Sequence, residues 1–172
     1  MAAHLPELPP SPWVREWIGW VPPGGAVLDL ACGSGRHARF LARMGFEVDA
    51  VDRDLSLFAD PPPGVRLLEA DLEQGAWPYP GRRWAGIVVT NYLHRPLLPI
   101  LVDSLEPLGM LIYETFARGN ERFGKPSNPA FLLAPGELLE AVRGKLRVVA
   151  YEDRVVKEPR EAAIQRIAAR RE

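Results

Sequence analysis

The stretch from Ala26 to Asp52, AVLDLACGSGRHARFLARMGFEVDAVD, constrains the fold more than any other part of the chain. It begins with a short apolar run at residues 27–31, which is typical of a buried strand of a parallel sheet. The turn Gly33-Ser34-Gly35 follows, then a predicted helix to about Met44 and a second strand at residues 46–51. Asp52 stands at the end of that strand. Such a unit is suited to holding a nucleotide-type cofactor against the start of a helix.

The rest of the chain continues the alternation of strands and helices. Apolar runs predict strands at residues 65–70, 84–90 and 110–116, and helical spacing predicts helices at 97–105 and from about Pro135. Between Asp54 and Asp60 we expect only a short helix, because three prolines follow. Residues 146–156 and 162–169 predict a terminal hairpin. The pattern predicts an α/β fold: a doubly wound, Rossmann-like sheet, mostly parallel, with helices on both faces and an antiparallel last strand.

Length and charge limit the class of protein. We expect one domain over residues 1–172, with a loose arm at 1–10 and an N-terminal helix at 11–21 that starts at a Ser11 cap. A net charge of −1 gives no reason to expect a nucleic-acid partner, and the apolar runs are too short to cross a membrane. We therefore expect a cytoplasmic protein. The chain has one cysteine, and no cluster with metal-ligand spacing, so no metal site is predicted. Nothing in the sequence indicates the oligomeric state.

Two classes of cofactor are compatible with the glycine turn. Gly33-x-Gly35-x-x-Ala38, with Asp52 19 residues after Gly33, satisfies the dinucleotide pattern, so an NAD(P)-dependent oxidoreductase is one alternative. Asp29 argues against it, because its charge would repel a pyrophosphate and would attract an amino-acid ammonium group. A chain of 172 residues also leaves no separate substrate domain.

Three motifs favour the other class. VLDLACGSG, VDAVD and LLEADL resemble the cofactor motifs of class I S-adenosylmethionine-dependent methyltransferases, and most of the chain is similar to small bacterial members of the tellurite-resistance type. The resemblance implies S-adenosyl-L-methionine as cofactor, S-adenosyl-L-homocysteine (SAH) as its product, and in-line transfer of a methyl group to a small-molecule acceptor. A non-catalytic module that only binds the cofactor is a further alternative.

The resemblance also implies roles for single residues. The methionine part of the cofactor is assigned to the first strand and the turn, at Asp29, Ala31, Cys32, Gly33, Ser34 and Gly35. The ribose and adenine are assigned to Asp52, Arg53, Asp71 and Leu72. Arg36 is expected either at the methionine carboxylate or on a solvated helix face. Cys32 has no partnered base, so we expect a packing role rather than a nucleophile.

Candidate acceptor residues follow the fourth and fifth strands. Asn91 and Tyr92 are expected near the sulfonium and, with His94, are the candidate catalytic residues. His94 is suited to general-base catalysis, although it could equally cap or pack the next helix. The stretch lacks the Asn/Asp-Pro-Pro-aromatic signature, which disfavours amino-methylation of DNA or of protein glutamine.

The second candidate wall begins with Arg95 and continues after the fifth strand. Its expected substrate-binding residues are Arg95, Glu114, Arg118, Arg122 and Phe123. The cations favour an anionic or carboxylate-bearing acceptor, and a charged, solvated loop is the alternative. A loop as long as that from Ala117 to Ala130 is a candidate lid.

Overall fold

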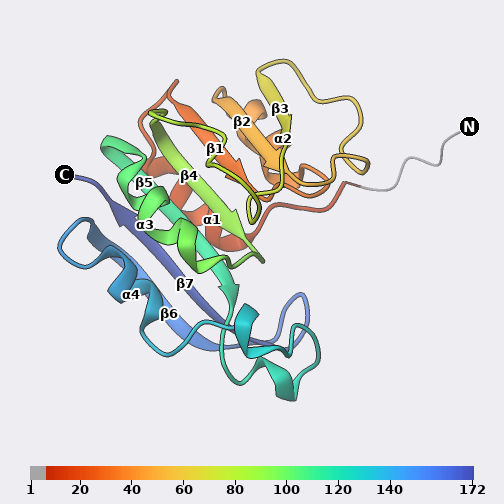
Figure 1. The fold of residues 1–172 in the computed structure, drawn as a ribbon, viewed down its shortest axis with the longest axis vertical. Helices are drawn as coiled ribbons and strands as arrows, with labels where there is room; N and C mark the ends of the chain where they lie inside the picture. The colour runs from red at the N-terminus through yellow and green to blue at the C-terminus, as the bar shows by residue number, and fades with distance from the viewer. Residues whose placement is uncertain (1–6) are drawn as a thin grey trace, which may run out of the picture.

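A seven-stranded sheet forms the centre of the computed structural model, which describes residues 7–172. Its strand order is β3-β2-β1-β4-β5-β7-β6 (Figure 1). The parallel strands are β1 (Ala26–Leu30), β2 (Glu47–Asp52), β3 (Val65–Glu69), β4 (Trp84–Thr90) and β5 (Leu105–Phe116). β7 (Ala162–Arg170) runs antiparallel to β5 and pairs with β6 (Arg147–Val156). The predicted mixed sheet with an antiparallel terminal hairpin is confirmed.

Helices cover both faces of the sheet, as predicted (Figure 1). α1 (Pro12–Trp17) and α2 (Arg36–Arg43) pack on one face, and α3 (Leu98–Asp103) and α4 (Glu137–Val142) on the other. Four short 3-10 turns complete the structure: η1 (Ile18–Trp20), η2 (Arg95–Leu97), η3 (Asn120–Arg122) and η4 (Pro129–Phe131). In the part of the chain that is described, no helix is long and apolar enough to cross a membrane.

α1 begins at the N-cap that the sequence predicts. The Ser11 side chain accepts a hydrogen bond from the Trp13 amide (3.2 Å), and Pro12 occupies the first turn. The Trp13 indole is buried and donates to the Ile167 carbonyl (3.1 Å), which fastens the helix to β7. Before this helix, residues 7–10 have no regular structure, and residues 1–6 of the expected loose arm lie outside the described residues.

Two segments differ from the prediction. The segment between β2 and β3 contains no helix, because the Asp54 carboxylate accepts a hydrogen bond from the Ser56 amide (2.9 Å) and forms a turn instead. The crossover helix α3 ends at Asp103, and β5 begins at Leu105 rather than at Met110. Leu105 pairs with Trp84, and the register shifts before Met110 pairs with Gly86.

Candidate functional site

A cavity of about 470 Å³ opens at the edge of the sheet where the parallel strands end. In open α/β sheets this edge is where ligands bind. Its lining comes from the ends of all five parallel strands and from the segment after β5, and comprises Ala31, Asp52, Arg53, Ala70, Asp71, Leu72, Glu73, Asn91, Tyr92, Leu93, Thr115, Phe116, Pro126 and Phe131. The structure thus brings seven of the predicted site residues together.

The glycine turn adjoins this cavity through Ala31, whereas Cys32, Gly33, Ser34 and Gly35 do not line it. Ala31, Gly33 and Gly35 all have positive φ (56°, 55° and 86°). The Gly33 amide donates to Asp52 Oδ2 (2.9 Å), so the Asp52 carboxylate also holds the turn in place. A Cβ on Gly33 would meet no atom within 4 Å, whereas a Cβ on Gly35 would lie 2.5 Å from the Phe58 ring. Gly35 is therefore needed for packing against Phe58, a residue that the sequence analysis missed.

Asp29 lies beneath the turn and does not line the cavity. It is 2% exposed, and its Oδ2 has no hydrogen-bond partner within residues 7–172. Burial raises the pKa of this carboxyl to about 7, and the opposing effects of the Ala38 amide and of Arg36 are smaller. A buried, unpaired carboxylate oxygen favours a cationic group nearby.

The two other acids of the cofactor motifs lie in the cavity wall. Asp52 ends β2, and its Oδ1 accepts from the Asp54 amide (3.1 Å). Asp71 follows β3, and its Oδ1 accepts from the Glu73 amide (2.9 Å). These bonds restrain both carboxylates in the cavity lining, to which Arg53 and Leu72 also belong.

Asn91 and Tyr92, which follow β4, also line the cavity. Asn91 has a positive φ of 55°, and its amide donates to the Glu114 carbonyl (2.9 Å). An asparagine adopts this conformation more readily than most residues, and such outliers gather at functional sites. Burial raises the pKa of Tyr92 to about 12, so its phenol stays protonated at neutral pH. His94 lies outside the cavity lining, with Nδ1 3.5 Å from Glu73 Oε1, and its side chain makes no capping hydrogen bond.

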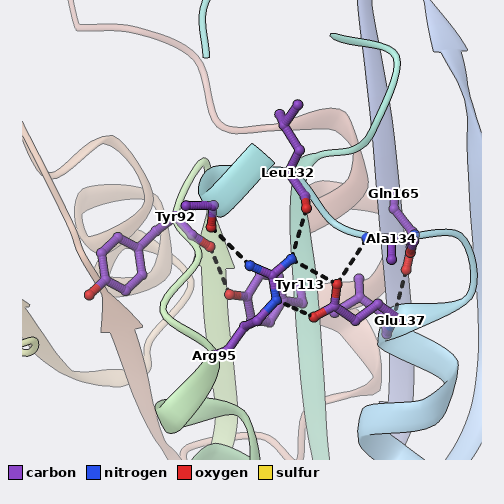
Figure 2. A network of polar contacts seen from close by, with 9 residues as sticks. Tyr92, Arg95, Tyr113, Leu132, Ala134, Glu137 and Gln165 are labelled. Carbon is purple, nitrogen blue, oxygen red and sulfur yellow. Dashed lines mark hydrogen bonds and ion pairs between the residues drawn. The ribbon is translucent and has the colours of Figure 1, made fainter. Parts of the chain in front are cut away.

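The Arg95 side chain is 39% exposed, and its guanidinium is paired with protein groups (Figure 2). Its guanidinium donates to both carboxylate oxygens of Glu137 (2.7 and 3.0 Å) and to the Ala130 and Leu132 carbonyls (2.9 and 2.8 Å). Burial would raise the pKa of Glu137, but hydrogen bonds from Arg95 and from the Ala134 amide outweigh burial and lower it. We call Arg95, Glu137 and the two carbonyls the arginine clamp. Arg95 does not line the cavity, and four of its five N–H groups already donate to protein groups, which disfavours the expected role in binding an acceptor.

Glu114 belongs to a second polar cluster, on the α1 and α2 face. Its carboxylate accepts from Arg166 (2.9 Å) and from the Ser11 hydroxyl (2.7 Å). The Ser11 amide donates to His37 Nε2 (3.0 Å), and burial lowers the pKa of His37 to about 3, so the ring is neutral. This cluster joins the N-terminal segment to β5, and Glu114 does not line the cavity.

The remaining predicted cations also lie away from the cavity. The Arg122 guanidinium donates to the Gly119 carbonyl (3.2 Å) and lies over the Phe123 ring, and neither residue lines the cavity. Arg118 is exposed and outside the lining, and Arg36 donates to the Pro9 carbonyl (3.1 Å). Around the cavity, the expected anion-binding wall is therefore not assembled.

The segment expected to be a lid is anchored at several points. Ala117 forms a bridge with Leu133, and the Asn120 side chain donates to the Pro126 carbonyl (2.9 Å). The side-chain oxygen Asn120 Oδ1 accepts from the Ala163 amide (3.1 Å), and Asn120 is buried. These contacts favour a fixed wall over a movable lid.

Cys32 has the packing role that the sequence suggested. It is buried in the cluster on the α1 and α2 face, and burial raises the pKa of its thiol, which disfavours the reactive thiolate. Within residues 7–172, no group of three His, Cys, Asp or Glu side chains could hold a metal ion.

Comparison with known proteins agrees with this geometry. Residues 13–59 match the family model of the tellurite resistance protein TehB. TehB from Haemophilus influenzae superposes with a TM-score of 0.73 at 17% identity, over 92% of this chain and 61% of that one. The chain therefore spans about three fifths of the length of that relative. No curated protein sequence matches significantly.

Two further solved structures share the fold. A TehB-like S-adenosylmethionine-dependent methyltransferase from Corynebacterium glutamicum has a TM-score of 0.67 at 19% identity, over 93% of this chain and 87% of that one. The Burkholderia thailandensis 1,6-didemethyltoxoflavin-N1-methyltransferase, solved with its substrate and SAH, has a TM-score of 0.68 at 19% identity, over 93% and 76%. The chain has the fold of class I S-adenosylmethionine-dependent methyltransferases. Its resemblance to the TehB type, expected from the sequence, is confirmed over the glycine-turn region.

Proposed function

We propose that the protein is an S-adenosylmethionine-dependent methyltransferase that acts on a small molecule. The observation that carries this proposal is a row of carboxylates on three neighbouring strands: Asp29 in β1, Asp52 at the end of β2 and Asp71 just after β3. TehB-like proteins and the toxoflavin enzyme, which share the fold, support the same reading.

The chain's residues fit this cofactor better than a dinucleotide. The unpaired buried oxygen of Asp29 suits a nearby ammonium group, and it would repel a pyrophosphate. Each Asp52 oxygen accepts one backbone hydrogen bond, from Gly33 or from Asp54. A carboxylate offers about four acceptor sites, so roughly two remain for the ribose hydroxyls. Asp71 and the Leu72 amide would bind the adenine edge.

The bound cofactor would supply a methyl group activated by its sulfonium sulfur. Alignment of the acceptor is then the main task of the chain, and positioning two reactants can lower a barrier by about 7–11 kcal/mol. Asn91 and Tyr92 line the cavity and, in this proposal, would stand near the methyl group that is transferred. Glu73 lines the cavity and contacts His94, so this pair is placed to receive a proton that an acceptor releases. A cytoplasmic location and the absence of a nucleic-acid partner remain predictions from the sequence.

Thermal unfolding with SAH and with NAD(H) tests the cofactor assignment. At a ligand concentration 100 times Kd, binding stabilises by about 2.7 kcal/mol, which raises Tm by roughly 5–10 °C for a chain of this size. We expect this shift with SAH and its loss in Asp52→Ala. Asp54→Ala is the matched control, because Asp54 lies two residues away and outside the cavity lining.

Stabilisation by NAD(H) and not by SAH would refute the proposal and favour an oxidoreductase. SAH binding without methyl transfer to any of a broad panel of acceptors would instead support a non-catalytic module.

A further inference from the structure

The cavity has a wall that the expected cofactor contacts leave free. Phe116 ends β5, and Pro126 and Phe131 come from the segment that follows it. We call these three residues the apolar wall. Phe131 lines the cavity and is 49% exposed, so part of its side-chain surface is open to a ligand.

The apolar wall is held in place by polar contacts behind it. Asn120 fixes Pro126 through its carbonyl, and the arginine clamp fixes the carbonyls on both sides of Phe131, at Ala130 and Leu132. The Arg160 guanidinium lies over the Phe116 ring (5.5 Å to the centroid) and donates to the Lys125 carbonyl (2.7 Å). The rings are therefore presented as a rigid surface, which lowers the entropy lost when a flat ligand binds.

The charge of the cavity opposes an anionic ligand. Among the described lining residues, Asp52, Asp71 and Glu73 are acidic and Arg53 alone is basic, a formal balance of −2. Arg160, over the Phe116 ring, donates to the Lys125 carbonyl and lies outside this lining. The cations that the sequence suggested for an anion are either paired with protein groups or outside the lining. Glu73 is the charged lining residue with no expected role at the cofactor.

We propose that the acceptor is a flat, uncharged heteroaromatic amine that lies against Phe116, Pro126 and Phe131, and not an oxyanion or a carboxylate; this inference rests on the proposed function. Aromatic rings prefer offset or edge contacts with one another, so a flat ring suits the Phe116 and Phe131 rings. The lone pair of the ring nitrogen forms the bond to the methyl carbon, and the carbon–sulfur bond breaks with its electron pair left on sulfur. The positive charge that develops on the nitrogen is stabilised by the acidic lining, and any N–H proton passes to the Glu73 carboxylate.

Matched probes test the inference on the full chain. Isoquinoline and benzimidazole, the carboxylate derivatives of both rings, and tellurite are each added to SAH-loaded protein for Tm measurement, and to protein with S-adenosylmethionine for product analysis. We expect the uncharged rings to raise Tm and to be N-methylated, with kcat/KM at least about tenfold above their carboxylates, because like charges in a cavity are strongly disfavoured. Preferred turnover of tellurite or of the carboxylates would overturn the inference, and so would the absence of any shift with the uncharged rings.

Two variants test whether Phe131 contacts the acceptor. Phe131→Ala should lower kcat/KM for isoquinoline about five- to tenfold and leave the Kd of SAH unchanged. Trp20→Ala is the control, because Trp20 is similarly exposed (47%) and lies outside the cavity lining, and it should change neither quantity. Equal losses in both variants would refute the assignment of Phe131. Failure of SAH to bind would refute the proposed function instead, while isoquinoline binding that Phe131→Ala weakens would still support the aromatic contact.

Discussion

Replacing Gly35 by alanine tests whether the second glycine of the turn serves the ligand or the protein core. The new Cβ would lie 2.5 Å from two carbons of the buried Phe58 ring and 2.6 Å from a third. The backbone is also left-handed there, with φ at 86°, which costs a non-glycine residue about 1–2 kcal/mol. Overpacking of a core position adds about 1–3 kcal/mol. We therefore expect Gly35→Ala to lower the free energy of unfolding by about 2–5 kcal/mol.

A double-mutant cycle with Phe58→Leu separates the two contributions. Leucine lacks the ring carbons that the Cβ would meet, so Gly35→Ala should cost only the backbone contribution in that background. The expected coupling is about 1–3 kcal/mol. Urea unfolding followed by tryptophan fluorescence measures each free energy, with a constant m-value as the check on two-state behaviour.

Gly33→Ala is the matched control within the same turn. Its Cβ would meet nothing within 4 Å, so its cost should be the backbone contribution alone and should be the same with Phe58 or Leu at position 58. The reasoning is refuted if Gly35→Ala costs the same in both backgrounds, or if Gly33→Ala couples to Phe58→Leu as strongly.

Two further predictions concern the ionisable residues Asp29 and Arg95. Burial raises the pKa of Asp29 to about 7 from 3.8, so the unfolded state binds fewer protons between these values and stability should fall as the pH rises through this window. Asp29→Asn should remove this dependence and be more stable than the wild type at pH 8 by up to about 4 kcal/mol, with no difference near pH 4; a constant difference in urea unfolding across this range would contradict the reasoning. Arg95→Ala should cost about 1.5–3 kcal/mol, because Glu137 and two carbonyls lose a charged donor. It should also speed proteolysis within residues 118–131, and a cycle with Glu137→Ala that shows no coupling would disprove the clamp.

The parts of the fold that sequence predicted well depend on local patterns. The apolar runs of β1 and β4 are fully buried on both faces, and such runs are specific to central parallel strands. The Ser11 cap is set by residues two positions apart. Only the start of β5 was mispredicted: the expected strand began at Met110, after Gly109, whereas β5 begins at Leu105 and continues through Leu108, which adopts a positive φ of 65°.

Asp52 and Asp71 could be predicted as cavity residues from the sequence, because they stand at strand ends that the pattern identifies. The residues expected to contact the acceptor could not be predicted in this way. The partner of Arg95 is Glu137, 42 residues away, and no local pattern shows that these two charges meet. Likewise, an arginine after a strand looks the same in sequence whether it contacts a substrate or a glutamate of the same chain. Phe131 carried no signal, since it lies in a short 3-10 turn without helical or strand periodicity.

The bridge between Ala117 and Leu133 has a consequence for how such a protein can change its specificity. The Leu133 amide donates to the Phe116 carbonyl and the Arg118 amide to the Leu133 carbonyl (both 3.0 Å), so the segment leaves and rejoins the sheet at one narrow neck. A chain between two such fixed points can be exchanged for another of different length or sequence, much as a hypervariable loop is grafted onto an antibody framework. Residues 119–131 could thus be altered, in evolution or by design, to accept a new substrate while the carboxylates on or after β1, β2 and β3 stay unchanged.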